Sequence, residues 1–192
     1  MKQRKIPKIK ITFPGLILIV VAFADLSGEG VVTLVAAGMH EMGHILAMVL
    51  FSVDIRSITL TPLGLEIDTK GMYKSFFEEM VITLSGCAVN FITFAFTYGF
   101  GGLISVFGVT SLLLGIMNIL PIRCLDGGEA LYTGVSIFCM PDRAERISRA
   151  VSFVTLIIMW VPATYIFLMS GYNYSLFIMS VWLFGKIFYE KK

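Results

Sequence analysis

Residues 30–53 read GVVTLVAAGMHEMGHILAMVLFSV, an apolar run long enough to cross a membrane as one helix. Near its middle, His40, Glu41 and His44 form the pattern H-E-x-x-H. Residues i and i+4 of a helix share one face, so both imidazoles can reach one metal ion while Glu41 touches a water bound to it. The alternative is a pair of core histidines hydrogen-bonded across helices, which leaves Glu41 without a role in hydrocarbon. The pattern therefore favours a metal site inside a membrane helix.

The composition indicates an integral membrane protein. Of the 192 residues, 57% are apolar and 15% are charged, whereas soluble domains have about 25% charged residues. Six helical spans would use roughly 120 residues, at about 20 residues each, and leave room only for short loops. The net charge of +2 gives no indication of nucleic-acid binding. Cys87, Cys124 and Cys139 lack the spacing of a disulfide framework or zinc knuckle, so we expect reduced thiols.

We predict an all-α polytopic fold in which residues 1–192 form one domain with about six transmembrane helices. The apolar runs place these spans at about 11–27, 30–52, 77–98, 103–121, 150–169 and 174–189. Between the second and third spans, residues 55–68 alternate apolar and polar side chains around the turn signal TPLG at 61–64. This alternation predicts a short β-hairpin at the membrane surface.

The distribution of basic residues predicts the orientation. All 15 Lys and Arg lie at the two ends, in the hairpin region or in the interval after the fourth span. The three loops on the other side, near residues 25–29, 99–102 and 171–173, contain none. By the positive-inside rule, both termini are expected in the cytoplasm. The basic start and the sequence AFA at 22–24 also fit a cleaved signal peptide, in which case residues 1–24 would be removed.

A catalytic zinc site usually has three protein ligands and one open position, so a third ligand must come from elsewhere in the chain. The acidic residues at the opposite membrane face or at a helix start are poor candidates: Asp25, Glu29, Glu78 and Glu79. Asp126 follows Pro121, which ends the fourth helix, and precedes two glycines that permit tight backbone geometry. Its carboxylate can turn toward the second helix. A helix-capping aspartate in a solvated loop is the alternative.

Two motifs together carry a family resemblance. H-E-x-x-H in one membrane helix, with residues 118–128 reading NILPIRCLDGG, or N-x-x-P-x-x-x-L-D-G-G, at the end of a later one, resembles the site-2 protease family of intramembrane zinc metalloproteases, peptidase family M50. The resemblance implies that His40, His44 and Asp126 hold one zinc ion per chain. It also implies that Glu41 is the catalytic acid and base.

The same resemblance implies substrate-binding residues. Asn118, at the start of the second motif, is expected to help hold the substrate near the metal. The sequence SGCAVN at 85–90 is similar to a family pattern of small residues ending in asparagine, which makes Asn90 a second candidate. The alternative for Asn90 is a polar contact that joins two helices.

The build is closest to the minimal, sporulation-type bacterial branch of the family. We expect neither a PDZ domain between the motifs nor a nucleotide-sensing CBS domain after the sixth span. The resemblance implies an enzyme of the bacterial cytoplasmic membrane that performs regulated intramembrane proteolysis. Its substrate would be a membrane-associated protein, such as a single-span anti-sigma factor or transcription-factor precursor. A membrane regulatory partner is also compatible with the resemblance.

Other functions remain open at this stage. One alternative is a catalytically inactive membrane scaffold, which would not need the complete set of three metal ligands and Glu41. A second is a metal carrier, which usually has further polar groups along a pathway. The prenyl-protein endoproteases share H-E-x-x-H but place their further ligand in an acidic helical motif. The predicted hairpin at 55–68 is expected either to bind an extended substrate along its edge or to serve as a surface loop.

Overall fold

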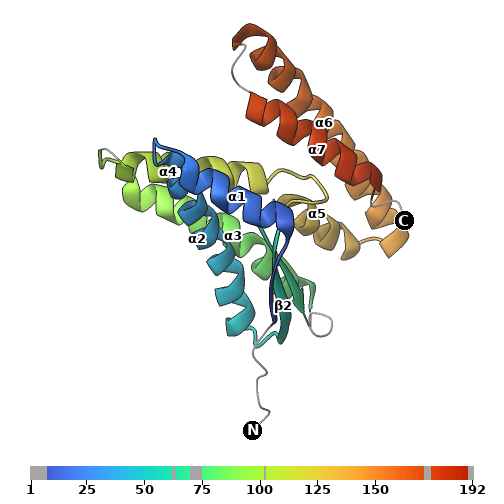
Figure 1. The fold of residues 1–192 in the computed structure, drawn as a ribbon. Coiled ribbons are helices and arrows are strands. Elements are labelled where there is room, and N and C mark those ends of the chain that lie inside the picture. Colours follow the sequence, from blue (N-terminus) through green and yellow to red (C-terminus); the bar gives the residue numbers. More distant parts are fainter. Residues whose placement is uncertain (1–7, 62–63, 70–74, 102, 171–173, 190–192) are drawn as a thin grey trace. The chain divides into compact units, whose positions relative to one another are not determined.

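The computed structural model describes residues 8–61, 64–69, 75–101, 103–170 and 174–189. The chain divides into two compact units, Met1–Met117 and Asn118–Lys192 (Figure 1). The predicted turn at 61–64 lies partly outside the described residues. Residues 1–7 and the loop at 171–173 lie entirely outside them. The expectations that one domain spans the chain and that residues 1–24 are retained or removed stay predictions.

In its described residues, the first unit combines four helices with a small sheet. Its elements are β1 (Lys8–Ile11), α1 (Phe13–Ala24), α2 (Glu29–Leu50), β2 (Ile55–Thr61), β3 (Gly64–Thr69), α3 (Phe76–Thr97) and α4 (Leu103–Asn118). Two of the helices begin at hydrogen-bonded caps, because the side chains of Thr12 and Ser75 accept from the backbone N–H three residues on. The helix α2 packs along α3, and α1 packs against α2.

The sheet differs from the predicted two-stranded hairpin. β2 and β3 pair antiparallel, with Ile58 opposite Ile67, as expected for a hairpin. However, β1 pairs parallel to the other side of β2, with Ile9 opposite Ile58. The order is therefore β1-β2-β3, so β2 is the central strand. Within the predicted hairpin, β2 is thus paired on both sides, and β3 is the outer strand.

The second unit consists of three helices: α5 (Asp126–Ser136), α6 (Pro141–Ser170) and α7 (Tyr174–Tyr189). The helices α6 and α7 lie side by side, and α5 packs on α6 (Figure 1). The helix α6 contains the fifth predicted span and begins before it, at Pro141; proline is favoured in a first helical turn. The short helix α5 was not predicted.

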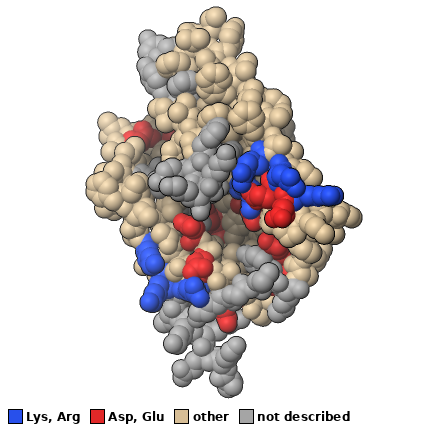
Figure 2. All heavy atoms as spheres, turned by 90° about the vertical axis from the view of Figure 1, so that its right-hand side faces the viewer, with Lys and Arg blue, Asp and Glu red and all other residues tan. Residues whose placement is uncertain are grey.

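The helices are apolar and well suited to a membrane. Among the described residues, α2, α3 and α6 are long and apolar enough to cross one, while α1 and residues 104–118 of α4 are shorter apolar helices. Large apolar side chains point outward, including Leu50 and Ile158, as expected for helices that face lipid. On the face drawn in Figure 2, charged side chains gather in small clusters on a mostly uncharged surface. The count of six spans stays a prediction.

Each unit has its own apolar core. In the first, Ala47 and Met48 of α2 pack with Ile82 of α3 and with side chains from the sheet. In the second, Ile122 of the loop before α5 packs with Leu156 of α6 and Leu183 of α7. These cores hold α2 against α3, and the loop at 119–125 against α6.

Candidate metal centre

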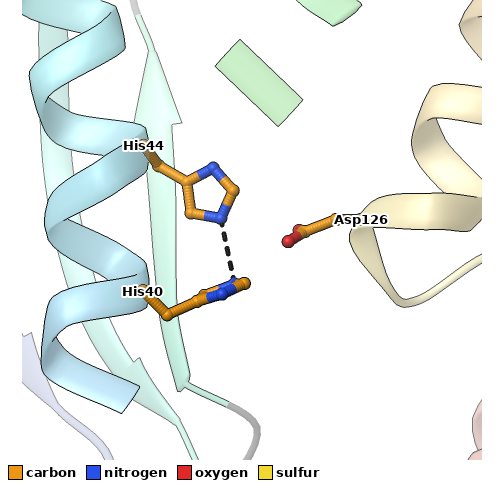
Figure 3. Close-up of side chains that lie close together, drawn as sticks. All are labelled: His40, His44 and Asp126. Carbon is orange, nitrogen blue, oxygen red and sulfur yellow. Dashed lines mark hydrogen bonds between the residues drawn. The ribbon is translucent and has the colours of Figure 1, made fainter. Parts of the chain in front are cut away.

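The two histidines of H-E-x-x-H lie together on one face of α2, as the sequence predicts (Figure 3). His40 and His44 are both buried, and their ring centroids are 4.8 Å apart. The Nε2 atoms of the two rings face one another at 3.2 Å. Both rings thus direct the same kind of nitrogen to one point, which is the arrangement expected of two ligands to one ion.

The Nδ1 atom of His44 is held by the backbone of α3. It lies 2.8 Å from the carbonyl oxygen of Ile82. A carbonyl oxygen only accepts hydrogen bonds, so the Nδ1 atom must carry the proton. The Nε2 atom of His44 then presents a lone pair. Metal-binding histidines typically have this kind of second contact, which fixes the ring and its tautomer.

The Nδ1 atom of His40 contacts a side chain of α3. The Nδ2 atom of Asn90 lies 3.1 Å from it, and Asn90 is fully buried. The sequence left two roles open for Asn90, substrate binding or a polar contact between helices. In the structure, Asn90 contacts His40. Its binding of substrate stays a prediction.

The distance between the paired nitrogens fits a zinc ion. Two Zn–N bonds of about 2.0–2.1 Å at a tetrahedral angle place the nitrogens about 3.3–3.4 Å apart, close to the observed 3.2 Å. Gly86 of α3 leaves the space beside them open, because a Cβ there would lie 2.3 Å from Nε2 of His44. The histidine pair therefore fits the predicted metal in both spacing and room.

Glu41 lies between the two histidines in sequence and is half-buried on α2. Asn118 is the last residue of α4 and is also half-buried. For each of these, the structure establishes the helix that carries it, while the predicted catalytic or substrate-binding role remains a prediction.

Asp126 is the first residue of α5, and the residue at the N-cap is Leu125. It therefore lies one position past the cap, and the helix-capping alternative does not describe its place. The preceding loop is tightly turned, since Leu125 N–H donates to the Ile122 carbonyl at 2.7 Å. The predicted helix break at Pro121 is confirmed, because α4 ends at Asn118.

The two glycines after Asp126 allow this turn through close contact. A Cβ at Gly127 would lie 2.0 Å from the Ile119 carbonyl oxygen, and one at Gly128 would lie 2.1 Å from that of Ile122. Contacts this short are impossible for a real side chain. The start of α5 can therefore approach the loop only because both positions are glycine, which explains the residues D-G-G in physical terms.

Sequence reasoning missed Arg123, a residue of this loop that joins it to α5 and α6. Its guanidinium forms ion pairs with Glu129 of α5 and, at 3.4 Å, with Glu145 of α6. It also lies over the Tyr132 ring, 4.2 Å from the centroid. Its backbone N–H donates to the Ser152 hydroxyl at 2.9 Å. A single arginine between a proline and an aspartate gave no signal, since its partners come from two later helices.

Figure 3 draws the two imidazoles of α2 and the Asp126 carboxylate of α5. Two imidazoles and one carboxylate are a ligand set that zinc enzymes use.

A model of peptidase family M50 matches residues 95–159, a segment that includes Asn118 and Asp126. The fold of this chain is similar to that of the site-2 protease from Methanocaldococcus jannaschii, with a TM-score of 0.68, 20% sequence identity, and coverage of 96% of this chain and 90% of that chain. No curated protein shows significant sequence similarity. The match to the M50 model and the apolar helices support an intramembrane metalloprotease.

Proposed function

We propose that this chain is a zinc-dependent endopeptidase that cleaves a membrane-associated protein in or near its transmembrane segment. The observation that carries the proposal is the buried pair of Nε2 atoms, 3.2 Å apart on an apolar helix, with Glu41 beside them in sequence. Asp126 is the proposed third ligand, and one zinc ion per chain is the proposed cofactor. Ionisable groups in such a helix are costly and mark function.

The residues have distinct roles in this proposal. Zinc held by His40, His44 and Asp126 supplies a Lewis acid that activates water and polarises the scissile carbonyl. Glu41 accepts the proton of the attacking water and delivers it to the leaving amine nitrogen. Asn118 holds the substrate strand by its amide.

The proposed substrate is a single-span membrane protein, of the anti-sigma or transcription-factor-precursor type. Every carbonyl of a membrane helix is hydrogen-bonded internally, so the substrate must unwind before its peptide bond can be attacked. An unwound segment can pair with a sheet edge. Because β2 is central, such pairing would use an outer strand, β1 or β3.

We also propose that the protein is integral to the cytoplasmic membrane of a bacterium, with both termini in the cytoplasm. The support is the placement of all 15 Lys and Arg on one side of the predicted spans. A regulatory membrane partner is compatible with this placement.

The test compares the wild-type chain with Glu41→Gln, and uses Glu29→Gln as the matched control because Glu29 is an exposed acid of the same helix. The zinc content of each purified protein is measured, and membrane proteomes of the expressing cells are compared for uncleaved single-span proteins. We expect Glu41→Gln to keep zinc and to lose at least about 100-fold in cleavage, while the control cleaves normally.

Three results would contradict the proposal. Equal cleavage by Glu41→Gln would exclude the proposed acid and base. Identical proteomes with wild type and with an empty vector would indicate a scaffold. Zinc transport that survives Glu41→Gln, without any cleavage by the wild type, would indicate a metal carrier.

A further inference from the structure

The helix α6 is longer than a membrane span, and its charged residues all lie near its start. It contains 30 residues, or about 45 Å of helix, whereas the hydrocarbon core of a bilayer is about 30 Å thick. Residues 150–170 contain no charged side chain and are long enough to fill that core. Residues 141–149 contain Asp142, Glu145 and three arginines. When residues 150–170 cross a membrane, the charged turns therefore extend into the layer of lipid headgroups.

One side of α6 is buried, and the opposite side is exposed. The buried side carries small or apolar side chains: Ala144, Ser148, Ser152, Leu156 and Ala163. Arg143 and Arg146 are exposed and lie on the opposite side, given the turn of 100° per residue. That side continues as exposed apolar residues in the uncharged part of the helix: Val154, Ile157 and Val161. The two arginines therefore lie in line with a surface that is suited to lipid tails.

The arginines of α6 differ in their partners. Arg149 forms an ion pair with Glu145 at 3.0 Å. The Nε atom of Arg146 donates to the backbone carbonyl oxygen of Asp142 at 3.2 Å, a contact that involves no carboxylate. Within the described residues, neither Arg143 nor Arg146 forms an ion pair. Arg143 and Arg146 are thus the two cations of α6 that are available to an anion from outside the chain.

The depth of these two arginines matches the position of lipid phosphates. At about 1.5 Å per residue, the backbone of Arg146 lies roughly 6 Å beyond residue 150, and the headgroup layer is about 5–8 Å thick in each leaflet. Arg143 lies further out, but arginine side chains are long enough to reach back to the headgroups. Residues i and i+3 of a helix are neighbours, with about 5–6 Å between their Cβ atoms. Both guanidinium groups can therefore reach one phosphate.

We propose that Arg143 and Arg146 form a binding site for an anionic phospholipid at the start of α6. The two guanidinium groups bind the headgroup phosphate, and the exposed Ile147 beside them contacts the acyl chains. Charge complementarity favours this occupant, because a zwitterionic headgroup brings an ammonium group that opposes the two arginines. Arg149 takes no part, since Glu145 already pairs with it. The proposal requires neither metal binding nor proteolysis.

The test measures lipid binding to the full-length chain purified in detergent. The chain is titrated with dioleoylphosphatidylglycerol or with dioleoylphosphatidylcholine, and the bound lipids are counted by native mass spectrometry. We expect the wild type to bind the anionic lipid at least about fivefold more tightly. Arg143→Gln and Arg146→Gln should each weaken its binding about fivefold, and the double variant about 25-fold. Binding of the zwitterionic lipid should change little.

Arg149→Gln is the matched control, because it removes the same charge from the same helix at a position that is already paired. It should change the affinity for the anionic lipid less than about twofold. Arg143 and Arg146 are exposed, so their glutamine variants should keep the melting temperature of the wild type.

Four results would overturn the proposal. Equal affinity of the wild type for the two lipids would exclude selection of an anionic headgroup. Wild-type affinity in the double variant would exclude the two arginines. Equal weakening by all three single variants would mean that only the total charge matters. Release of the lipid by inorganic phosphate, at an ionic strength matched with chloride, would indicate a site for soluble phosphate. Zinc content, measured on the same samples, is expected to stay unchanged in every variant.

Discussion

Gly86 of α3 faces His44 of α2 so closely that a Cβ at position 86 would lie 2.3 Å from the Nε2 atom of His44. The same Cβ would lie 2.8 Å from Nε2 of His40. Both nitrogens therefore lie against bare backbone. The room that an ion would need beside them exists because α3 has no side chain at this point.

Gly86→Ala is expected to weaken zinc binding at least about tenfold, because the new methyl group would separate or turn the two rings; overpacking of this kind costs about 1–3 kcal/mol. The matched control is Gly38→Ala on α2, where an added Cβ meets nothing within 4 Å. Chelator competition measures both. Wild-type affinity in Gly86→Ala would mean that the ion does not use this space.

Gly127→Ala is expected to disturb the loop that presents Asp126. The added Cβ would meet the Ile119 carbonyl oxygen at 2.0 Å, so the start of α5 must shift. We expect a loss of about 1–3 kcal/mol in unfolding free energy together with a loss of zinc. Gly134→Ala in the same helix has open space and should be neutral or stabilising. Equal melting temperatures for the two variants would refute the close contact.

Arg123→Met is expected to loosen the same loop from outside. It removes the ion pairs with Glu129 and Glu145 and the contact with the Tyr132 ring. Because these groups are partly exposed, we expect a loss of only about 1 kcal/mol. A double-mutant cycle with Glu145→Gln at low and high salt measures the coupling, which should shrink as salt screens it. Additive effects at low salt would show that the pair contributes nothing.

Much of the site was predictable because its signals are local. The spacing of His40 and His44 places them on one helix face, and the structure confirms it. The helix break near Pro121 is likewise a property of that residue. The partners of these residues were not predictable in the same way. The contacts of Asn90 and Gly86 with the histidines exist only because α3 packs against α2, which periodicity does not reveal.

The sheet and α5 are features that local sequence patterns do not predict. The strand Lys8–Ile11 is four residues long and pairs with β2, whose residues lie more than forty positions later. No local sequence pattern predicts such a pairing. The first turn of α5 contains Gly127 and Gly128 directly after Asp126, and glycines are poor helix formers, so the segment resembled a loop. There the close packing of the backbone outweighs propensity.

The proposed orientation predicts which side of the membrane each corner faces. Ser27, in the corner between α1 and α2, lies in a loop without basic residues. In a cysteine-free background, Ser27→Cys should react with a membrane-impermeant thiol reagent added to intact cells. A cysteine restored at position 139, in the basic interval, should react only after the cells are opened. The reverse pattern would invert the topology.

The most direct test of the central claim is the zinc content of the purified full-length chain, measured by elemental analysis beside the variants His44→Ala and Asp126→Ala. The account predicts one zinc ion per wild-type chain and at least a tenfold loss of affinity in each variant, with the fold retained. A wild-type chain without zinc, or an Asp126→Ala chain that binds zinc as tightly as the wild type, would contradict it.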